Sequence, residues 1–152
     1  MISDLMMLSN TCKYGIRAVI YLAWRAGEDK RIGIKTISND LGIPTPFLGK
    51  IMQTLVRHKI LKSSKGPHGG FSLGKPAGEI SMLDIILIID GSDLFDMCLV
   101  DVKSCAEIQK KNSPCTLHEA FEPVRKEIYR LFRDITIENL VNDLEKHRHL
   151  KI

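Results

Sequence analysis

KTISNDLGIPTPFLGKIMQTLVRHKIL, residues 35–61, is the most informative stretch of this chain. It predicts two helices joined by a tight turn. Thr36 is a candidate N-cap for a short first helix, and Gly42 supplies the permissive turn residue. Thr45 is a candidate N-cap for the second helix, with Pro46 at the first helical position, where the missing N–H does no harm. This order is typical of a helix-turn-helix, although any small helical hairpin can share it.

The second predicted helix has one apolar and one polar face. Its apolar residues recur at three- and four-residue spacing and are expected to be buried: Phe47, Leu48, Ile51, Met52, Leu55 and Val56. The opposite face holds Gly49, Lys50, Gln53, Thr54 and Arg57 and is suited to a DNA major groove. The candidate DNA contacts on this helix are therefore Thr45, Pro46, Lys50, Gln53 and Arg57.

A basic hairpin is predicted directly after this helix. Residues 61–65 and 71–73 are short strand-like runs, and GPHGG between them is a loop suited to tight or left-handed backbone. A second helix followed at once by such a hairpin predicts a winged helix. Lys65 and His68 are candidate wing contacts to a minor groove or a phosphate. His68 is equally compatible with an exposed loop residue that has no partner.

Two further helices are predicted to complete the core of this unit. The first ends near Gly27 and has a buried stripe at helical spacing, formed by Tyr14, Ala18, Val19, Leu22, Ala23 and Ala26. The second opens at Ser81 and Asp84, which resemble a capping box. Cys12, at the start of the first helix, is interpreted as a small buried thiol.

The composition predicts a globular chain with one core and an appendage: 152 residues, 44% of them hydrophobic. No run approaches the ~20 apolar residues of a membrane span. The N-terminus lacks a basic region ahead of an apolar one, so no signal peptide is expected. We therefore expect a cytoplasmic protein without membrane contact and with reduced thiols.

Charge is distributed unevenly along the chain, although the formal net charge is only +4. Residues 35–75 hold a single acid, Asp40, against seven basic residues: Lys35, Lys50, Arg57, Lys59, Lys62, Lys65 and Lys75. A polyanion such as DNA suits this face, and a solvated surface is the alternative.

Residues 98–118, CLVDVKSCAEIQKKNSPCTLH, combine Cys98, Cys105, Cys115 and His118. Thiolates and imidazole are the ligands that soft or borderline metals and iron–sulfur clusters prefer. Structural zinc usually uses two cysteines two to four residues apart, and no such pair occurs here. The spacing favours a cluster, leaving zinc or metal-free cysteines as alternatives. Thr116 and Glu119 predict a capped helix that begins directly after Cys115.

That last long helix has an apolar stripe of about five turns, which predicts a two-fold symmetric dimer. The expected interface residues are Phe121, Val124, Ile128, Leu131 and Phe132. A shorter terminal helix is expected around residues 137–144, packing back onto its own domain or onto the partner's.

Several motifs in order resemble the IscR/NsrR-like (Rrf-two) winged-helix regulators of bacteria: KYGIRAVIYLA, ISNDLGIP, FLGKIMQTL, KGPHGGF with LGKP, and PCTLHEAF. The resemblance implies a dimeric transcription regulator, and in several members a 2Fe-2S or 4Fe-4S cluster. Cys98, Cys105 and Cys115 match the family's cysteines, and His118 matches its C-x2-H histidine. The cysteine spacing is wider than usual in the family, and Gly49 replaces an acidic base-reading residue of some members.

These observations predict a mainly α fold with a small β-wing, a winged helix-turn-helix followed by a long dimerisation helix. The predicted divisions are a DNA-binding domain at 1–92, a cluster loop at 93–116 and dimerisation and terminal helices at 117–152. The expected function is a homodimeric repressor of a near-palindromic operator, controlled by an iron–sulfur cluster, with 2Fe-2S favoured over 4Fe-4S. No catalytic constellation or C-x-x-C pair is present, so no enzyme is expected. The alternatives are a zinc- or thiol-based regulator of this fold, or a zinc-stabilised interaction module without DNA binding.

Overall fold

The computed structural model describes residues 7–26, 30–96 and 116–146. Its elements are α1 (Asn10–Ala26), α2 (Ile34–Leu41), α3 (Thr45–Arg57), β1 (Leu61–Ser64), β2 (Gly70–Leu73), the short 3-10 helix η1 (Ala77–Glu79), α4 (Met82–Ile89), α5 (Asp93–Asp96), α7 (Thr116–Asp134) and α8 (Ile137–Lys146). The predicted fold class, mainly α with a small β-wing, is confirmed.

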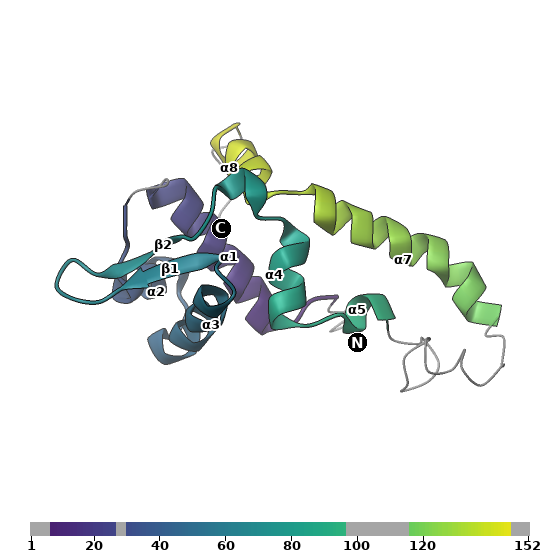
Figure 1. Ribbon diagram of the computed structural model, residues 1–152, viewed down its shortest axis with the longest axis horizontal. Helices are drawn as coiled ribbons and strands as arrows, with labels where there is room; N and C mark the ends of the chain where they lie inside the picture. The colour runs from purple at the N-terminus through teal and green to yellow at the C-terminus, as the bar shows by residue number, and fades with distance from the viewer. Residues whose placement is uncertain (1–6, 27–29, 97–115, 147–152) are drawn as a thin grey trace.

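Helix α1 runs through the centre of the head, which we define as α1 to α4 with the wing (Figure 1). Helices α2, α3, α4 and α8 and strand β2 all pack against it. Val19 and Leu22 are completely buried in this core. Gly15 faces Ile89 on α4 so closely that a Cβ atom at this position would collide with the isoleucine side chain. Cys12 is fully buried, as expected from the sequence.

Helices α2 and α3 form the predicted helix-turn-helix, and Gly42 makes the turn with a left-handed φ of 66°. Both predicted caps are wrong. Helix α2 begins at Ile34 after Gly33, which places Thr36 inside the helix. Helix α3 begins at Thr45 itself, with Pro44 in the capping position and no side-chain cap.

Strands β1 and β2 form the wing, and the predicted hairpin is confirmed. They pair antiparallel from Leu61 opposite Leu73 to Ser64 opposite Gly70. An additional bridge, which was not predicted, joins Ile32 to Phe71 through two backbone hydrogen bonds of 3.0 and 2.9 Å. The segment before α2 thus continues the small sheet and braces the wing against the head.

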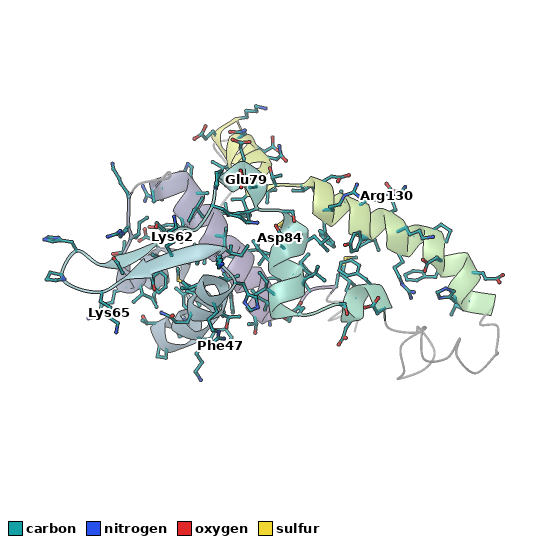
Figure 2. All side chains as sticks on the ribbon, viewed as in Figure 1. Phe47, Lys62, Lys65, Glu79, Asp84 and Arg130 are labelled. Carbon is teal, nitrogen blue, oxygen red and sulfur yellow. The ribbon has the colours of Figure 1, made fainter. Side chains whose placement is uncertain are left out.

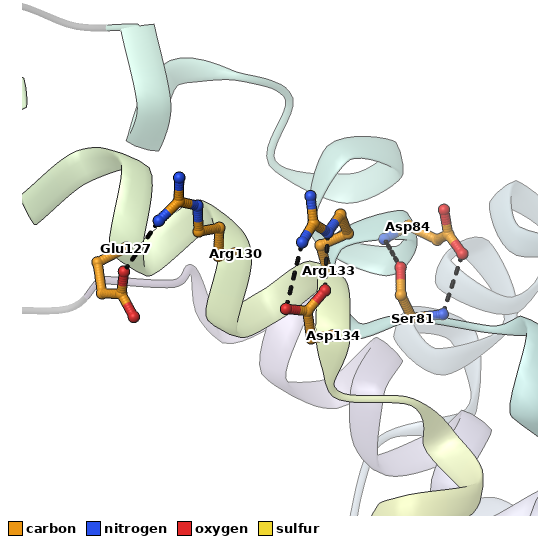
Figure 3. Close-up of polar contacts among 6 residues, drawn as sticks. All are labelled: Ser81, Asp84, Glu127, Arg130, Arg133 and Asp134. Atoms are coloured by element: carbon orange, nitrogen blue, oxygen red, sulfur yellow. Dashed lines mark hydrogen bonds and ion pairs between the residues drawn. The ribbon is translucent and has the colours of Figure 1, made fainter. Parts of the chain in front are cut away.

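Helix α4 starts with the predicted capping box (Figure 3). The Asp84 backbone N–H donates to Ser81 Oγ at 3.1 Å, and the Ser81 N–H donates to Asp84 Oδ2 at 3.0 Å. Lys75 lies 3.5 Å from the same carboxylate oxygen. Two of the otherwise unpaired N–H groups at this helix end are therefore satisfied locally.

Helix α7 projects away from the head, and α8 returns to it (Figure 1). Their junction is tied to the start of α4, because Met82 N–H donates to the Ile135 carbonyl and Ile137 N–H to the Ile80 carbonyl, both at 2.9 Å. Helix α8 then packs on α1 and η1 of its own chain. The terminal helix therefore covers the domain it belongs to.

Candidate functional site

The polar face of α3 is the first candidate site. Lys50, Gln53 and Arg57 are exposed on it, as predicted. The opposite face is buried in the core through Leu48, Ile51, Met52 and Leu55. This division follows from the 3.6-residue helical period, which keeps the three polar side chains on one face.

One predicted core residue of α3 is instead at the surface. The Phe47 side chain is 40% exposed, and its ring packs edge-to-face on Tyr14 with centroids 5.8 Å apart. Phe47 lies in the first turn of α3, at the surface of the head (Figure 2). The prediction that Phe47 is buried is therefore wrong.

Arg57 is held in place on the exposed face. Its Nη2 donates to Thr54 Oγ1 at 2.9 Å, and Thr54 Oγ1 donates to the Lys50 carbonyl at 3.1 Å. These bonds restrict the rotamers of a long side chain, which lowers the entropy lost when the guanidinium binds an anion. Guanidinium groups form bidentate contacts with phosphates and with guanine.

Thr45 has a structural role inside the turn. Its hydroxyl donates to Ser38 Oγ at 2.8 Å, and Ser38 Oγ donates to the Ile43 carbonyl at 2.5 Å. This chain of bonds explains why Thr45 does not cap α3: its hydroxyl is used across the turn, between α2 and α3. Pro46, the next residue, is exposed.

Lys62, Lys65 and His68 are exposed on the wing, where Figure 2 shows the two lysines. Strand β1 of the wing packs against α3. Lys59, between α3 and β1, was not predicted as a site residue. It adopts a left-handed φ of 62°, and among the described residues it is the only non-glycine residue with a positive φ. A left-handed conformation normally favours glycine, and a sequence does not show φ. The sequence therefore contains no signal that Lys59 holds this conformation.

Asp40, the single acidic residue of residues 35–75, contacts two side chains of α1. Tyr21 Oη donates to Asp40 Oδ2 at 2.5 Å, and Arg25 Nη2 lies 3.9 Å from the same oxygen. Burial and then the hydrogen bond to this carboxylate raise the pKa of Tyr21. Because Arg25 offsets part of the Asp40 charge at α1, the face formed by α3 and the wing remains positively charged.

His118 in the first turn of α7 is the second candidate site. Its Nε2 lies 3.8 Å from Glu122 Oε2, while its Nδ1 is buried and has no hydrogen-bond partner among the described residues. Cys98, Cys105 and Cys115 lie outside the described residues, as does the N-cap of α7. Within residues 7–26, 30–96 and 116–146, no three His, Cys, Asp or Glu side chains are grouped to bind a metal.

The predicted apolar stripe of α7 divides into two rows. Ile128 and Phe132 are half-buried and pack against the core of their own chain. Leu117, Val124 and Leu131 are 41%, 48% and 53% exposed, at seven-residue spacing. Phe121 is half-buried, with the Arg125 guanidinium 5.5 Å from its ring centre. The exposed row is the part of the stripe that a second chain can cover.

Comparison with known proteins decides the family. The model of the Rrf2 family, described as an iron-dependent transcriptional regulator, matches residues 8–143. The chain belongs to the Rrf2 (Rrf-two) family. An Aquifex aeolicus protein that carries the name of an HTH-type transcriptional regulator is 35% identical over 142 residues, covering 93% of this chain and 96% of that protein. IscR of Photorhabdus laumondii is 28% identical, covering 92% and 82%.

Solved structures show the same fold. IscR of T. potens has a TM-score of 0.70 at 24% identity and covers 95% of this chain and 93% of its own. CymR, described as the global cysteine regulator of B. subtilis, has a TM-score of 0.71 at 21% identity and covers 93% and 98%. The Rrf2 family and its relatives are transcriptional regulators, so this chain is one and not an enzyme. In the described part of the chain, no helix has the length and apolar character to cross a membrane.

Proposed function

We propose that this Rrf2 regulator binds DNA through α3 and the wing, as a homodimer and as a repressor in the cytoplasm. The contacts are Lys50, Gln53 and Arg57 on α3 and Lys65 and His68 on the wing. Pro46 lies beside the DNA backbone. Thr45 supports the turn through its hydroxyl and contacts DNA through its main chain. Two copies of α3 enter successive major grooves of a near-palindromic operator, ~34–36 Å or a multiple of this apart.

The dimer forms through α7. The exposed Val124 and Leu131 face the partner helix, together with Leu117 and the half-buried Phe121. Ile128 and Phe132 support this row from the side of the head. Apolar residues that recur every seven positions lie on one face of a helix, so a second helix can pack along this row. The proposed divisions of the chain remain 1–92 for DNA binding, 93–116 for the cluster and 117–152 for the dimerisation helix and the C-terminal helix.

An iron–sulfur cluster held by Cys98, Cys105, Cys115 and His118 controls DNA affinity in this proposal, with 2Fe-2S favoured and 4Fe-4S as the alternative. The observation that carries it is the buried Nδ1 of His118 without a partner among the described residues, because an imidazole nitrogen left in this state suits a metal. Three thiolates and one imidazole are a suitable donor set for a cluster. When bound, the cluster supplies redox and ligand-exchange chemistry.

A structural change at the cluster site can reach α3 through the contacts that connect α7, α4 and α3. The far end of α7 is hydrogen-bonded to residues 80–82, at the start of α4, and α4 packs on α1 and α3. A shift of α7 therefore moves the two heads of the dimer relative to each other, and their spacing determines which operator they fit.

The test compares anaerobically purified wild type with a Cys105→Ala variant. We expect the wild type to show visible absorption bands and the Cys105→Ala variant to lack them. We also expect the two proteins to differ in their affinity for the operator. Equal affinity of the two proteins for every candidate operator contradicts control by a cluster.

A zinc- or thiol-based regulator of the same fold is the second candidate, supported by the fold shared with CymR, whose description names cysteine rather than iron. It predicts a colourless protein with one zinc per chain or none. Metal analysis of the anaerobic protein separates it from the first candidate, and operator binding separates both from a zinc-stabilised module without DNA affinity.

A further inference from the structure

The two ring nitrogens of His118 have different surroundings. Nε2 points along α7 towards Glu122, with 3.8 Å to Oε2. Nδ1 is buried and without a hydrogen-bond partner in the described part of the chain. One nitrogen thus faces a carboxylate, and the other has no hydrogen-bond partner among the residues that the structure describes.

Glu122 is itself fixed by cations on the same helix. Arg125 Nη1 lies 3.5 Å from Oε2, and Lys126 Nζ lies 3.6 Å from Oε1. The Arg125 side chain is buried, and the Glu122 side chain is half-buried. These two contacts hold the carboxylate close to His118, which lies one helical turn earlier on α7.

Building on the cluster proposed above, we propose that Glu122 is a positioning residue that makes Nδ1 of His118 the iron-binding atom. A neutral imidazole carries one N–H, and the carboxylate selects the tautomer with that proton on Nε2 and the lone pair on Nδ1. Histidine ligands of metals commonly donate their second N–H to a carboxylate, which orients the ring and increases its basicity.

The distance between His118 and Glu122 leaves room for the contact to shorten when the cluster binds. At 3.8 Å, Nε2 and Oε2 are farther apart than in a hydrogen bond. A metal at Nδ1 withdraws electron density from the ring and makes Nε2–H a stronger donor. The contact with Glu122 is therefore expected to shorten when the cluster binds.

The first test identifies the binding nitrogen in the wild-type protein. Full-length protein is produced with histidine labelled with 15N at Nδ1 only or at Nε2 only, and the reduced, paramagnetic cluster is studied by electron-nuclear double resonance. We expect the strongly coupled 15N signal in the Nδ1-labelled sample. A strongly coupled signal from the Nε2 label overturns the proposal.

The second test compares Glu122→Gln with Glu127→Gln. Both remove one carboxylate from α7, but Glu127 is 77% exposed and pairs with Arg130 at 3.7 Å (Figure 3). We expect Glu122→Gln to lose its cluster to a chelator about tenfold faster than the wild type and to have a higher reduction potential, because a less basic imidazole stabilises oxidised iron less. Glu127→Gln should match the wild type, and far-ultraviolet circular dichroism checks that both variants fold.

The outcomes separate this inference from the proposed function. If the wild type shows no cluster bands after anaerobic reconstitution, the cluster proposal fails and the role of Glu122 fails with it. If the wild type binds a cluster but Glu122→Gln releases it at the wild-type rate and with the same potential, only the role of Glu122 is overturned.

Discussion

The Asp90 carboxylate joins the end of α4 to the start of α1, accepting a hydrogen bond from the Ser9 backbone N–H at 2.9 Å. Ser9 Oγ also donates to Asp90, and it accepts from the Cys12 N–H at 3.0 Å as the N-cap of α1. We expect Asp90→Ala to lower the free energy of unfolding by about 2 kcal/mol, because hydrogen bonds to charged groups contribute about 1.5–3 kcal/mol. Urea denaturation measures this loss, and Asp93→Ala is the control, because Asp93 is an exposed residue of α5. Equal effects of the two substitutions would contradict a specific role for Asp90.

Cys12 makes the stability depend on alkaline pH. Burial, then the charge of and hydrogen bond to Asp90, raises the pKa of its thiol from 9.0 to about 12. The folded chain therefore holds a proton that the unfolded chain releases above pH 9, so this contribution is complete below pH 9 and falls between pH 9 and about 12. Denaturation midpoints measured across this range should fall less steeply for Cys12→Ala. In the native protein at pH 8, alkylation mapped by mass spectrometry should leave Cys12 unmodified.

Lys50 and Lys65 should control the salt dependence of operator binding. If each contacts one phosphate, Lys50→Ala or Lys65→Ala reduces the slope of log affinity against log salt by about 0.9. Lys146→Ala is the control, because this residue ends α8, across the head from α3 (Figure 1). Unchanged slopes in both lysine variants would place the interface elsewhere.

Gln53 should affect the choice of sequence more than the salt dependence. A glutamine that reads an adenine contributes about 1–3 kcal/mol of discrimination, so Gln53→Ala should relax the preference at one base pair per half-site. Binding to a library of operator variants at fixed salt tests this. A uniform loss of affinity across all variants would identify Gln53 as a backbone contact instead.

Lys59 is expected to lower the stability of the head. A non-glycine residue in a left-handed conformation lowers the stability of the folded state by roughly 1–2 kcal/mol. Glycine removes this cost, but it loses more conformational entropy on folding, so only part of the stability is regained. Lys59→Gly should therefore raise the free energy of unfolding by roughly 0.5–1 kcal/mol. Lys62→Gly, in strand β1, should have the opposite sign. Thermal denaturation of both variants compares them directly.

Leu131 tests the proposed dimer. Leu131→Asp places a charge in the exposed row of α7 without disturbing the core of its own chain, so the protein should remain folded and become monomeric. Analytical ultracentrifugation detects this change. Trp24→Ser removes another exposed apolar side chain, 44% exposed on α1, and should leave the association unchanged. A dimeric Leu131→Asp protein would exclude this row as the interface.

Local patterns in the sequence were sufficient for the elements themselves. The helix-turn-helix, the hairpin of the wing and the Ser81–Asp84 capping box each depend on residues a few positions apart, and the structure confirms all three. The caps at Thr36 and Thr45 failed for the same local reason. The Thr45 hydroxyl was assigned without knowing that Ser38 lies within reach of it, and Thr36 was assigned without knowing that α2 already begins at Ile34.

Pairings across the chain could not be predicted in this way. Asp90 meets Ser9 across 81 residues, and Ile32 meets Phe71. Phe71 lies in a predicted strand, but no local pattern around any of these four residues identifies its partner. Their partners are determined only when the helices pack, because many register and packing choices satisfy the same periodicity.

By itself, the sequence determined the winged helix, the basic face of α3 and the existence of an amphipathic α7, because charge and apolar spacing are properties of the chain. The tertiary structure decided which apolar residues of α7 remain at the surface: Ile128 and Phe132 pack against their own head, whereas Val124 and Leu131 do not. It also decided that His118 has one nitrogen towards Glu122 and the other buried. The division of the α7 stripe depends on the direction in which α7 leaves the head, and that direction is set by the hydrogen bonds between residues 80–82 and 135–137.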